Sequence, residues 1–447
     1  MSGWEPRGTK SRLTIVQARY VVPVRPARTV LEDHAVVIEG EQIVDLLPSG
    51  SARAHYPTAQ TVQLDRHVLL PGLINMHTHT PMSLLRGFAD DLDLGVWLNE
   101  HIWPAEKAHV TPEFIADGAR LAIAEMLRGG TTCFNDMYFF PGEIAEVAIA
   151  TGMRACIGFP VFEMATSWAN DVDGYFEKGL ALIESDGRSP LVRYAISPHA
   201  PYSVSDRTLE RVAEISLRYS IPVHTHLLET DFEVAHSLQV HGCRPLQRLD
   251  RLGLLSQNLI AVHVTQLEPG DAAFLADRSV HVVHCPQSNL KLASGMCPVA
   301  DLLSASVNVA IGTDGAASNN NLDLLSEAQT AALLAKGLSA NPCAMDAYTT
   351  LEMLTINGAR ALNMEAAIGS IEVGKQADLV ALDLYAPETQ PVHNVVSQLI
   401  YAASSRQFTD AWVAGRALLR SGELTTIDLP DVLRAADTWR VKLMKRP

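Results

Sequence analysis

Short apolar segments alternate with longer stretches of helical periodicity through the middle of the chain. Segments such as LPGLINMH, LIAVHV and VNVAIGTD are short enough for buried strands, and most are followed by helical patterns such as PEFIADGARLAIAEMLRGG. Eight such strands fit a (β/α)₈ barrel better than an open doubly wound sheet, and no G-x-G-x-x-G motif follows a strand. The sequence therefore predicts an α/β fold in which residues 71–364 form a (β/α)₈ TIM barrel.

Both ends of the chain are rich in β-forming residues. Two candidate strands precede the barrel, RLTIVQARYVVPV and HAVVIEGEQIVDLLP, and the second has a turn at Gly40–Glu41. Two more follow it, ADLVALDL and TDAWVAGRALLRSGEL, the latter folded over Ala414–Gly415, before a helix that starts at Leu429 and ends in a basic tail. Neither β segment is large enough to be stable alone. We therefore expect residues 1–70 and 365–447 to form one small β-sandwich domain together.

The composition indicates a folded protein with a large core. Apolar residues make up 47% of the chain and charged residues 19%, which excludes a disordered chain. The net charge of −15 argues against nucleic-acid binding, and no apolar run is long enough to span a membrane. The six cysteines contain no C-x-x-C pair, and the start of the chain has no apolar signal core. We expect a cytoplasmic protein without a disulfide framework.

Polar residues gather at the predicted carboxyl ends of the strands, where the catalytic loops of a barrel begin. Six of the sixteen histidines fall at these positions, although the positions are a small fraction of the chain. Histidines buried at random in a core would not sort in this way, so the pattern predicts a site at the mouth of the barrel. In chain order, the residues at the strand ends are His77 with His79, Asp136, Phe159, His199, His226, His263, His284 and Asp314.

Four of these residues have the chemistry of a metal site. His77 and His79 share one face of a strand, so both imidazoles can face one ion. With His226 and Asp314, from strands five and eight, they would leave room for a water on zinc, iron or manganese. Asp314 could instead be a helix cap or a turn residue. His224 shares a face with His226, but its deeper position favours an ordinary packed histidine.

Three further residues are candidates for catalysis or binding. Glu229 follows His226 by three residues, where a carboxylate can move a proton between a metal-bound water and a leaving group. Its alternative is a solvated residue at the start of the next helix. His263 closes an apolar strand, where a histidine is often part of the core. Glu106 lies in a segment that would roof the barrel mouth, although carboxylates in such segments are usually on the surface.

The ordered motifs of the chain resemble those of the amidohydrolase superfamily, and more closely those of the 5′-methylthioadenosine/S-adenosylhomocysteine deaminases. The resemblance covers nearly the whole chain. It implies metal-dependent hydrolytic deamination of the adenine ring of 5′-methylthioadenosine to 5′-methylthioinosine and ammonia, with S-adenosylhomocysteine and adenosine as further candidate substrates. The motifs are PGLINMHTHTPMSLLRG, WPAEKAH, SPHAPYS, HTHLLET, HCPQSNLKLASG and GTDGAASNN.

The resemblance also implies a role for each candidate residue. One divalent ion, most often zinc in the family, would be held by His77, His79, His226 and Asp314. Glu229 would be the catalytic acid/base that protonates N1 of the adenine, Asp314 would take the remaining proton of the attacking water, and His263 would steady the tetrahedral centre. Glu106 would hold the ribose hydroxyls, and His199, Glu229 and Asp314 would also contact the substrate.

One position departs from the pattern of relatives that accept S-adenosylhomocysteine. They have an arginine a few residues beyond the GMR motif, whereas this chain has Phe159; Arg154 belongs to the motif itself and is expected to point elsewhere. An aromatic side chain suits a methylthio group better than a charged homocysteine tail, so we predict a preference for 5′-methylthioadenosine.

Two other functional classes stay open at this point. The first is a guanine or 8-oxoguanine deaminase, or an aryl-chloride hydrolase of the same branch. The second is a non-catalytic barrel scaffold, which the presence of all four candidate ligands and Glu229 disfavours. The expected partner is a small nucleoside, without nucleic acid or membrane, and the resemblance also allows a homo-oligomer.

Overall fold

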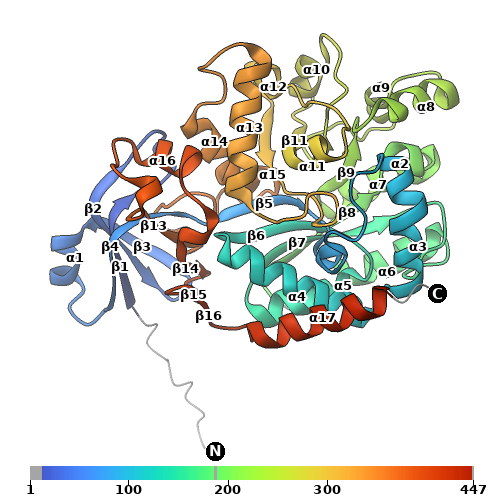
Figure 1. The fold of residues 1–447 in the computed structure, drawn as a ribbon. Coiled ribbons are helices and arrows are strands. Elements are labelled where there is room, and N and C mark those ends of the chain that lie inside the picture. The colour runs from blue at the N-terminus through green and yellow to red at the C-terminus, as the bar shows by residue number, and fades with distance from the viewer. Residues whose placement is uncertain (1–12, 186–188, 445–447) are drawn as a thin grey trace, which may run out of the picture.

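Two eight-stranded sheets organise the chain, and helices surround one of them (Figure 1). The computed structural model describes residues 13–185 and 189–444. The expectations for the first twelve residues and for the basic tail at 445–447 lie outside the described residues. No helix among the described residues combines the length and the apolar character needed to cross a bilayer.

The first sheet is the predicted barrel. Its strands pair in parallel and in chain order. A backbone hydrogen bond joins the end of the last strand to the first strand. The N–H of Asp314 donates to the carbonyl oxygen of His77 at 2.9 Å. The strands are almost wholly buried, as expected where helices cover a parallel sheet. The prediction of a (β/α)₈ barrel is confirmed. The strands are β5 (Leu73–Thr78), β6 (Thr131–Met137), β7 (Arg154–Val161), β8 (Val192–Pro198), β9 (Val223–Leu227), β10 (Leu259–His263), β11 (His281–His284) and β12 (Asn308–Ile311).

Two of the helices that follow these strands have clear sequence signals at their starts. Thr111 accepts a hydrogen bond from the Phe114 N–H and precedes a proline at the first helical position, and Ser205 accepts one from the Thr208 N–H. The helices are α4 (Pro112–Arg128), α5 (Pro141–Thr151), α6 (Val172–Glu184), the short η3 (Pro201–Ser203), α7 (Asp206–Tyr219), α8 (Asp231–His241), α9 (Pro245–Arg251), α10 (Asp271–Asp277), α11 (Pro286–Lys291), α12 (Val299–Ser304), α13 (Leu324–Ser339), α14 (Ala347–Leu354) and α15 (Ile356–Ala361).

A long segment between β5 and α4 lies at the carboxyl ends of the strands. It folds into four short helical pieces and buries Trp97, Ile102 and Glu106. Because it follows the strand that carries His77 and His79, it forms part of the wall of the barrel mouth. The pieces are η1 (Thr80–Leu85), α2 (Leu94–Val96), η2 (Trp97–Ile102) and α3 (Trp103–His109).

The second sheet combines both ends of the chain, which confirms the predicted composite β domain. Its strand order is β16-β15-β14-β13-β4-β1-β2-β3, so β4 and β13 join the two ends. The two predicted hairpin turns meet, since a Cβ atom at Gly415 would lie 2.1 Å from the carbonyl oxygen of Gly40. The elements are β1 (Leu13–Val21), β2 (Leu31–Glu39), β3 (Gln42–Pro48), α1 (Ser49–His55), β4 (Gln60–Pro71), β13 (Leu379–Asp383), η4 (Pro387–Thr389), α16 (Val395–Tyr401), η5 (Ser405–Gln407), β14 (Phe408–Val413), β15 (Arg416–Arg420), β16 (Glu423–Leu424) and α17 (Leu429–Met444).

A buried ion pair joins the two sheets. Arg154, the first residue of β7, donates from Nε to one oxygen of Asp378 at 2.6 Å and from a terminal nitrogen to the other at 2.9 Å. Both side chains are 2% exposed. Arg154 therefore points away from the barrel mouth, as the sequence led us to expect.

Candidate active site

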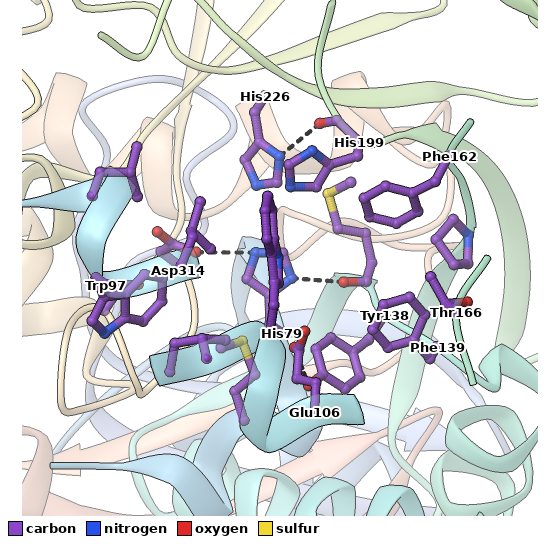
Figure 2. Close-up of a pocket in the computed structure, with 18 of the residues that line it drawn as sticks. His79, Trp97, Glu106, Tyr138, Phe139, Phe162, Thr166, His199, His226 and Asp314 are labelled. Carbon is purple, nitrogen blue, oxygen red and sulfur yellow. Dashed lines mark hydrogen bonds and ion pairs between the residues drawn. The ribbon is translucent and has the colours of Figure 1, made fainter. Parts of the chain in front are cut away.

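A cavity of about 610 Å³ opens at the carboxyl ends of the barrel strands (Figure 2). One wall comes from the segment between β5 and α4, and the floor comes from the strand ends. Most of the lining is apolar or aromatic, and the polar groups converge on one side, which is typical of a small-molecule site. Seven of the sequence-predicted residues line this cavity together: His79, Glu106, His199, His226, Glu229, His263 and Asp314.

Two imidazoles face one carboxylate at the floor. The Nε2 atoms of His77 and His79 each lie 3.2 Å from Oδ1 of Asp314. Asp314 has a left-handed backbone, with φ at 63°, and a Cβ atom at Gly312 would lie 2.7 Å from the backbone nitrogen of His77. Only glycine allows this close approach of β12 to β5. The sequence Gly312-Thr313-Asp314 thus allows Asp314 to lie beside the two histidines.

The Nδ1 atoms of His79 and His226 donate hydrogen bonds to backbone carbonyl groups. His79 Nδ1 lies 2.6 Å from the carbonyl oxygen of Met137, and His226 Nδ1 lies 2.7 Å from that of His199. A carbonyl oxygen only accepts, so in the neutral rings the proton sits on Nδ1 and the lone pair on Nε2. His77 Nδ1 is paired with Nε2 of His224 at 2.9 Å.

These groups together fit a divalent cation. One ligand atom from each of His77, His79 and His226 lies within 4.8 Å of the others, and the same holds for His77, His263 and Asp314. The buried His77 Nε2 lies 3.2 Å from Asp314 Oδ1 but makes no hydrogen bond of good geometry among the described residues. Imidazole nitrogens with outer hydrogen bonds to carbonyl groups, beside a carboxylate, are a typical ligand set for zinc and similar ions.

Glu229 lies beside this cluster. Its Oε1 accepts a hydrogen bond from the Ser294 hydroxyl at 3.3 Å, and its Oε2 lies 3.8 Å from Nε2 of His263. Burial raises the pKa of the Glu229 carboxyl. Its alternative interpretation, a solvated residue at a helix start, is wrong because the side chain is buried and faces the cavity.

His263 and Asp314 have supporting contacts of their own. His263 Nδ1 is paired with Oδ1 of Asn289 at 2.8 Å, and its ring stacks on that of His226 with centroids 5.4 Å apart. The Ser288 hydroxyl donates to the second oxygen of Asp314 at 2.6 Å. Burial alone would disfavour a charge on Asp314, but the histidines outweigh burial and hold its pKa well below the usual range.

Glu106 and His199 lie on the walls of the cavity (Figure 2). Glu106 is buried, which raises the pKa of its carboxyl to about 7, and it accepts a hydrogen bond from the Tyr138 hydroxyl. The ring of His199 stacks on Phe162, with centroids 4.7 Å apart. Burial lowers the pKa of His199 to about 3, so this imidazole is neutral at pH 7.

Comparison with known proteins agrees with this geometry. Residues 68–418 match the family model described as "Amidohydrolase family". The chain belongs to the amidohydrolase family. A protein from Teredinibacter turnerae named 5-methylthioadenosine/S-adenosylhomocysteine deaminase is 46% identical over 96% of this chain and 97% of its own length. One of the same name from Saccharophagus degradans is 44% identical, over 96% of both chains. The resemblance found in the sequence is therefore confirmed.

Solved structures share the fold of this chain. A structure described as an adenosine deaminase from Xanthomonas campestris with bound zinc superposes with a TM-score of 0.96, at 52% identity, over 97% of this chain and 99% of that chain. An atrazine chlorohydrolase from Arthrobacter aurescens has a TM-score of 0.89 at 23% identity, covering 95% of this chain and 99% of its own. At that identity the likeness shows the shared barrel alone.

The predicted place of Phe159 in this amidohydrolase is wrong. Its side chain is fully buried and packs on α6, where a Cβ atom at Gly179 would lie 2.3 Å from the ring. Neighbouring residues of a strand point to opposite faces, so Pro160 and not Phe159 lines the cavity. The inference of substrate preference from Phe159 loses its basis.

Several residues of the amidohydrolase site were missed or undervalued in the sequence. His224 was expected to be ordinary core, yet it bonds to His77. Tyr138, which bonds to Glu106, directly follows strand β6, and this position was the available signal. Asp136 is not in the cavity lining; it accepts hydrogen bonds from Thr78 and from the Thr80 N–H, and so fixes the turn around His79. His284 does not line this cavity; together with Asn289 it lines a separate small void.

Proposed function

We propose that this hydrolase holds one divalent cation, zinc by preference, and deaminates the adenine ring of 5′-methylthioadenosine to 5′-methylthioinosine and ammonia. The supporting observation is that Glu229, His79, His226 and Asp314 line one largely apolar cavity, and that the buried His77 lies beside Asp314 and completes the cluster. The names of the relatives agree with an adenine nucleoside as substrate, and the zinc in the Xanthomonas structure agrees with the cation. S-adenosylhomocysteine and adenosine are further candidate substrates.

The residues divide the chemistry among them. His77, His79, His226 and Asp314 would hold a divalent cation, which when bound would lower the pKa of water to about 7 and so supply a nucleophile at neutral pH. Glu229 carries one proton of the attacking water to N1 of the adenine. The raised pKa of the Glu229 carboxyl makes its protonated form more accessible near neutral pH. Asp314 accepts the remaining proton of the attacking water and passes it to the C6 amino group, which leaves as ammonia when the C6–N bond breaks. His263, 3.8 Å from Glu229, steadies the charge that develops at C6.

The cavity walls account for recognition of the rest of the substrate. Glu106 accepts hydrogen bonds from the ribose hydroxyls, and the neutral His199 contacts the base. Among the described residues no arginine lines the cavity, and Lys107 is its only lysine. A methylthio group would be surrounded by apolar and aromatic side chains, of which Trp97, Phe139, Phe162 and Met164 are members.

The test is a deamination assay with metal content measured on the same sample. The substrates are adenosine, 5′-methylthioadenosine, S-adenosylhomocysteine and guanine, with ammonia release as the readout. We expect the highest kcat/KM for 5′-methylthioadenosine and about one zinc per chain, as for one ion shared by four proposed ligands. Turnover of guanine alone, or no bound metal in protein purified without chelators, would contradict the proposal.

Glu106 separates nucleoside substrates from free bases. Glu106→Ala should raise KM for 5′-methylthioadenosine at least tenfold, because a buried carboxylate that bonds two hydroxyls is lost. If nucleoside turnover is unchanged in this variant, the ribose-binding role is wrong. The guanine deaminase and chlorohydrolase alternatives have support only from distant structures, at 22% and 23% identity, and these share the fold alone.

We also infer that the enzyme acts in the cytoplasm. All six cysteines are free thiols, and four of them are buried in the described core. Free thiols agree with a reducing compartment.

A further inference from the structure

A second buried carboxylate belongs to Glu233, in the helix that follows Glu229. Glu233 is in the first turn of α8 and is 1% exposed. Its Oε1 accepts a hydrogen bond from the Leu228 N–H at 2.9 Å, and its Oε2 accepts one from the Glu229 N–H at 3.1 Å. The side chain therefore binds both successive backbone N–H groups that lead into the proposed acid/base.

The peptide that Glu233 binds has an uncommon conformation. Leu228 adopts a left-handed backbone, with φ at 53°, which costs energy for a leucine unless the surroundings enforce it. On the opposite edge, Thr265 donates from its N–H to the Leu228 carbonyl oxygen at 2.9 Å and from its hydroxyl to the Glu229 carbonyl oxygen at 2.7 Å. Glu233 and Thr265 thus hold the two edges of the same turn.

The turn determines where the Glu229 carboxylate lies. Glu229 has weak contacts of its own, at 3.3 Å to Ser294 and 3.8 Å to His263, so its side chain is positioned mainly by its backbone. No cationic side chain is hydrogen-bonded to Glu233 within the described chain. Burial raises the pKa of the Glu233 carboxyl to about 8. An uncompensated buried carboxyl is costly, and a first-turn residue that served only as a helix cap could do so from the surface.

We propose that Glu233 is a positioning residue for the deamination: it binds the Leu228–Glu229 peptide in its left-handed turn and so aims the Glu229 carboxylate at the substrate ring. This inference rests on the proposed function of Glu229. Removal of Glu233 should affect the proton-transfer step more than substrate binding, because Glu106 belongs to α3 and His199 follows β8.

The experiment compares Glu233→Gln and Glu233→Ala with Asp231→Asn. Glutamine keeps the volume and one acceptor oxygen, whereas alanine removes both. Asp231 is an exposed acid in the same helical turn and makes no hydrogen bond to Glu229 in the described chain, so it controls for the loss of charge at the start of α8. The readouts are kcat and KM for 5′-methylthioadenosine, zinc content and the melting temperature.

We expect kcat to fall about tenfold to a hundredfold in Glu233→Ala and less in Glu233→Gln, with KM within about threefold and zinc content unchanged. Asp231→Asn should match the wild type. A folded Glu233→Ala with wild-type kcat, a loss confined to KM or zinc content, or failure of both Glu233 variants to fold would each overturn the positioning role. If the wild type releases no ammonia from any adenine nucleoside, the proposed function itself fails.

Discussion

The hydroxyl of Tyr138 donates a hydrogen bond to Oε1 of Glu106 at 2.5 Å, and both residues are buried in the wall of the cavity. Tyr138 follows β6, and Glu106 belongs to α3 in the segment that precedes α4. The bond therefore ties that segment to the barrel and holds the carboxylate in place, with its other oxygen available to a ligand.

Loss of the Tyr138 hydroxyl should weaken substrate binding. Tyr138→Phe keeps the ring and frees Glu106, so we expect KM for the nucleoside to rise about three- to tenfold with a smaller change in kcat. Steady-state kinetics measure both. Tyr219→Phe is the matched control, because its hydroxyl bonds to Glu184 on the outside of the barrel. An unchanged KM in Tyr138→Phe would mean that Glu106 needs no support.

His224 should contribute to metal affinity without contacting the metal. His224→Phe removes the hydrogen-bond partner of His77 Nδ1. Loss of a hydrogen bond to the second nitrogen of a metal-binding histidine typically lowers metal affinity by roughly 10- to 100-fold. Competition with a chelator of known affinity measures the change. His281→Phe is a suitable comparison, because His281 is also a buried strand histidine but pairs with Asn308 and not with the cluster. Equal metal affinity in the two variants would contradict this role.

Removal of the cation should abolish activity and lower thermal stability. A chelator removes the cation from its proposed protein ligands. An ion that binds only the folded state stabilises that state by about 4 kcal/mol at a thousandfold excess over its Kd. We expect activity to return when zinc is added back after dialysis. Melting curves with and without metal are recorded alongside the assay. If the activity and the melting temperature both stay constant on removal of the metal, the site is contradicted.

The ion pair of Arg154 and Asp378 should be important for stability and not for chemistry. Arg154→Met leaves Asp378 buried without a cation, which typically costs about 3–5 kcal/mol of the free energy of unfolding. Urea unfolding measures this cost. The control is Arg434→Gln, in an exposed pair on α17, where about 0–1 kcal/mol is expected. The double variant Arg154→Met/Asp378→Leu should be less destabilised than Arg154→Met alone; a double variant that is less stable would contradict a charge-burial origin.

Sequence reasoning was most successful where a local rule fixes a position. The strand-end rule of a barrel predicted that His79, His226, His263 and Asp314 share one mouth, and they do. The rule depends only on the direction of each strand, so it needs no knowledge of packing. It failed for Phe159, because a shift of one residue along β7 exchanges the two faces of the strand.

The sequence by itself determined the barrel, the composite β domain and the residue types available at the mouth, because alternating apolar segments and polar strand ends are local properties of the chain. Only the tertiary structure decided which of those residues act together. Whether His224 is ordinary core or a partner of His77, and whether Glu233 is solvated or bound to the turn before Glu229, depends on side-chain direction and on contacts between separate elements. Those contacts are fixed by packing in three dimensions, and sequence spacing does not encode them.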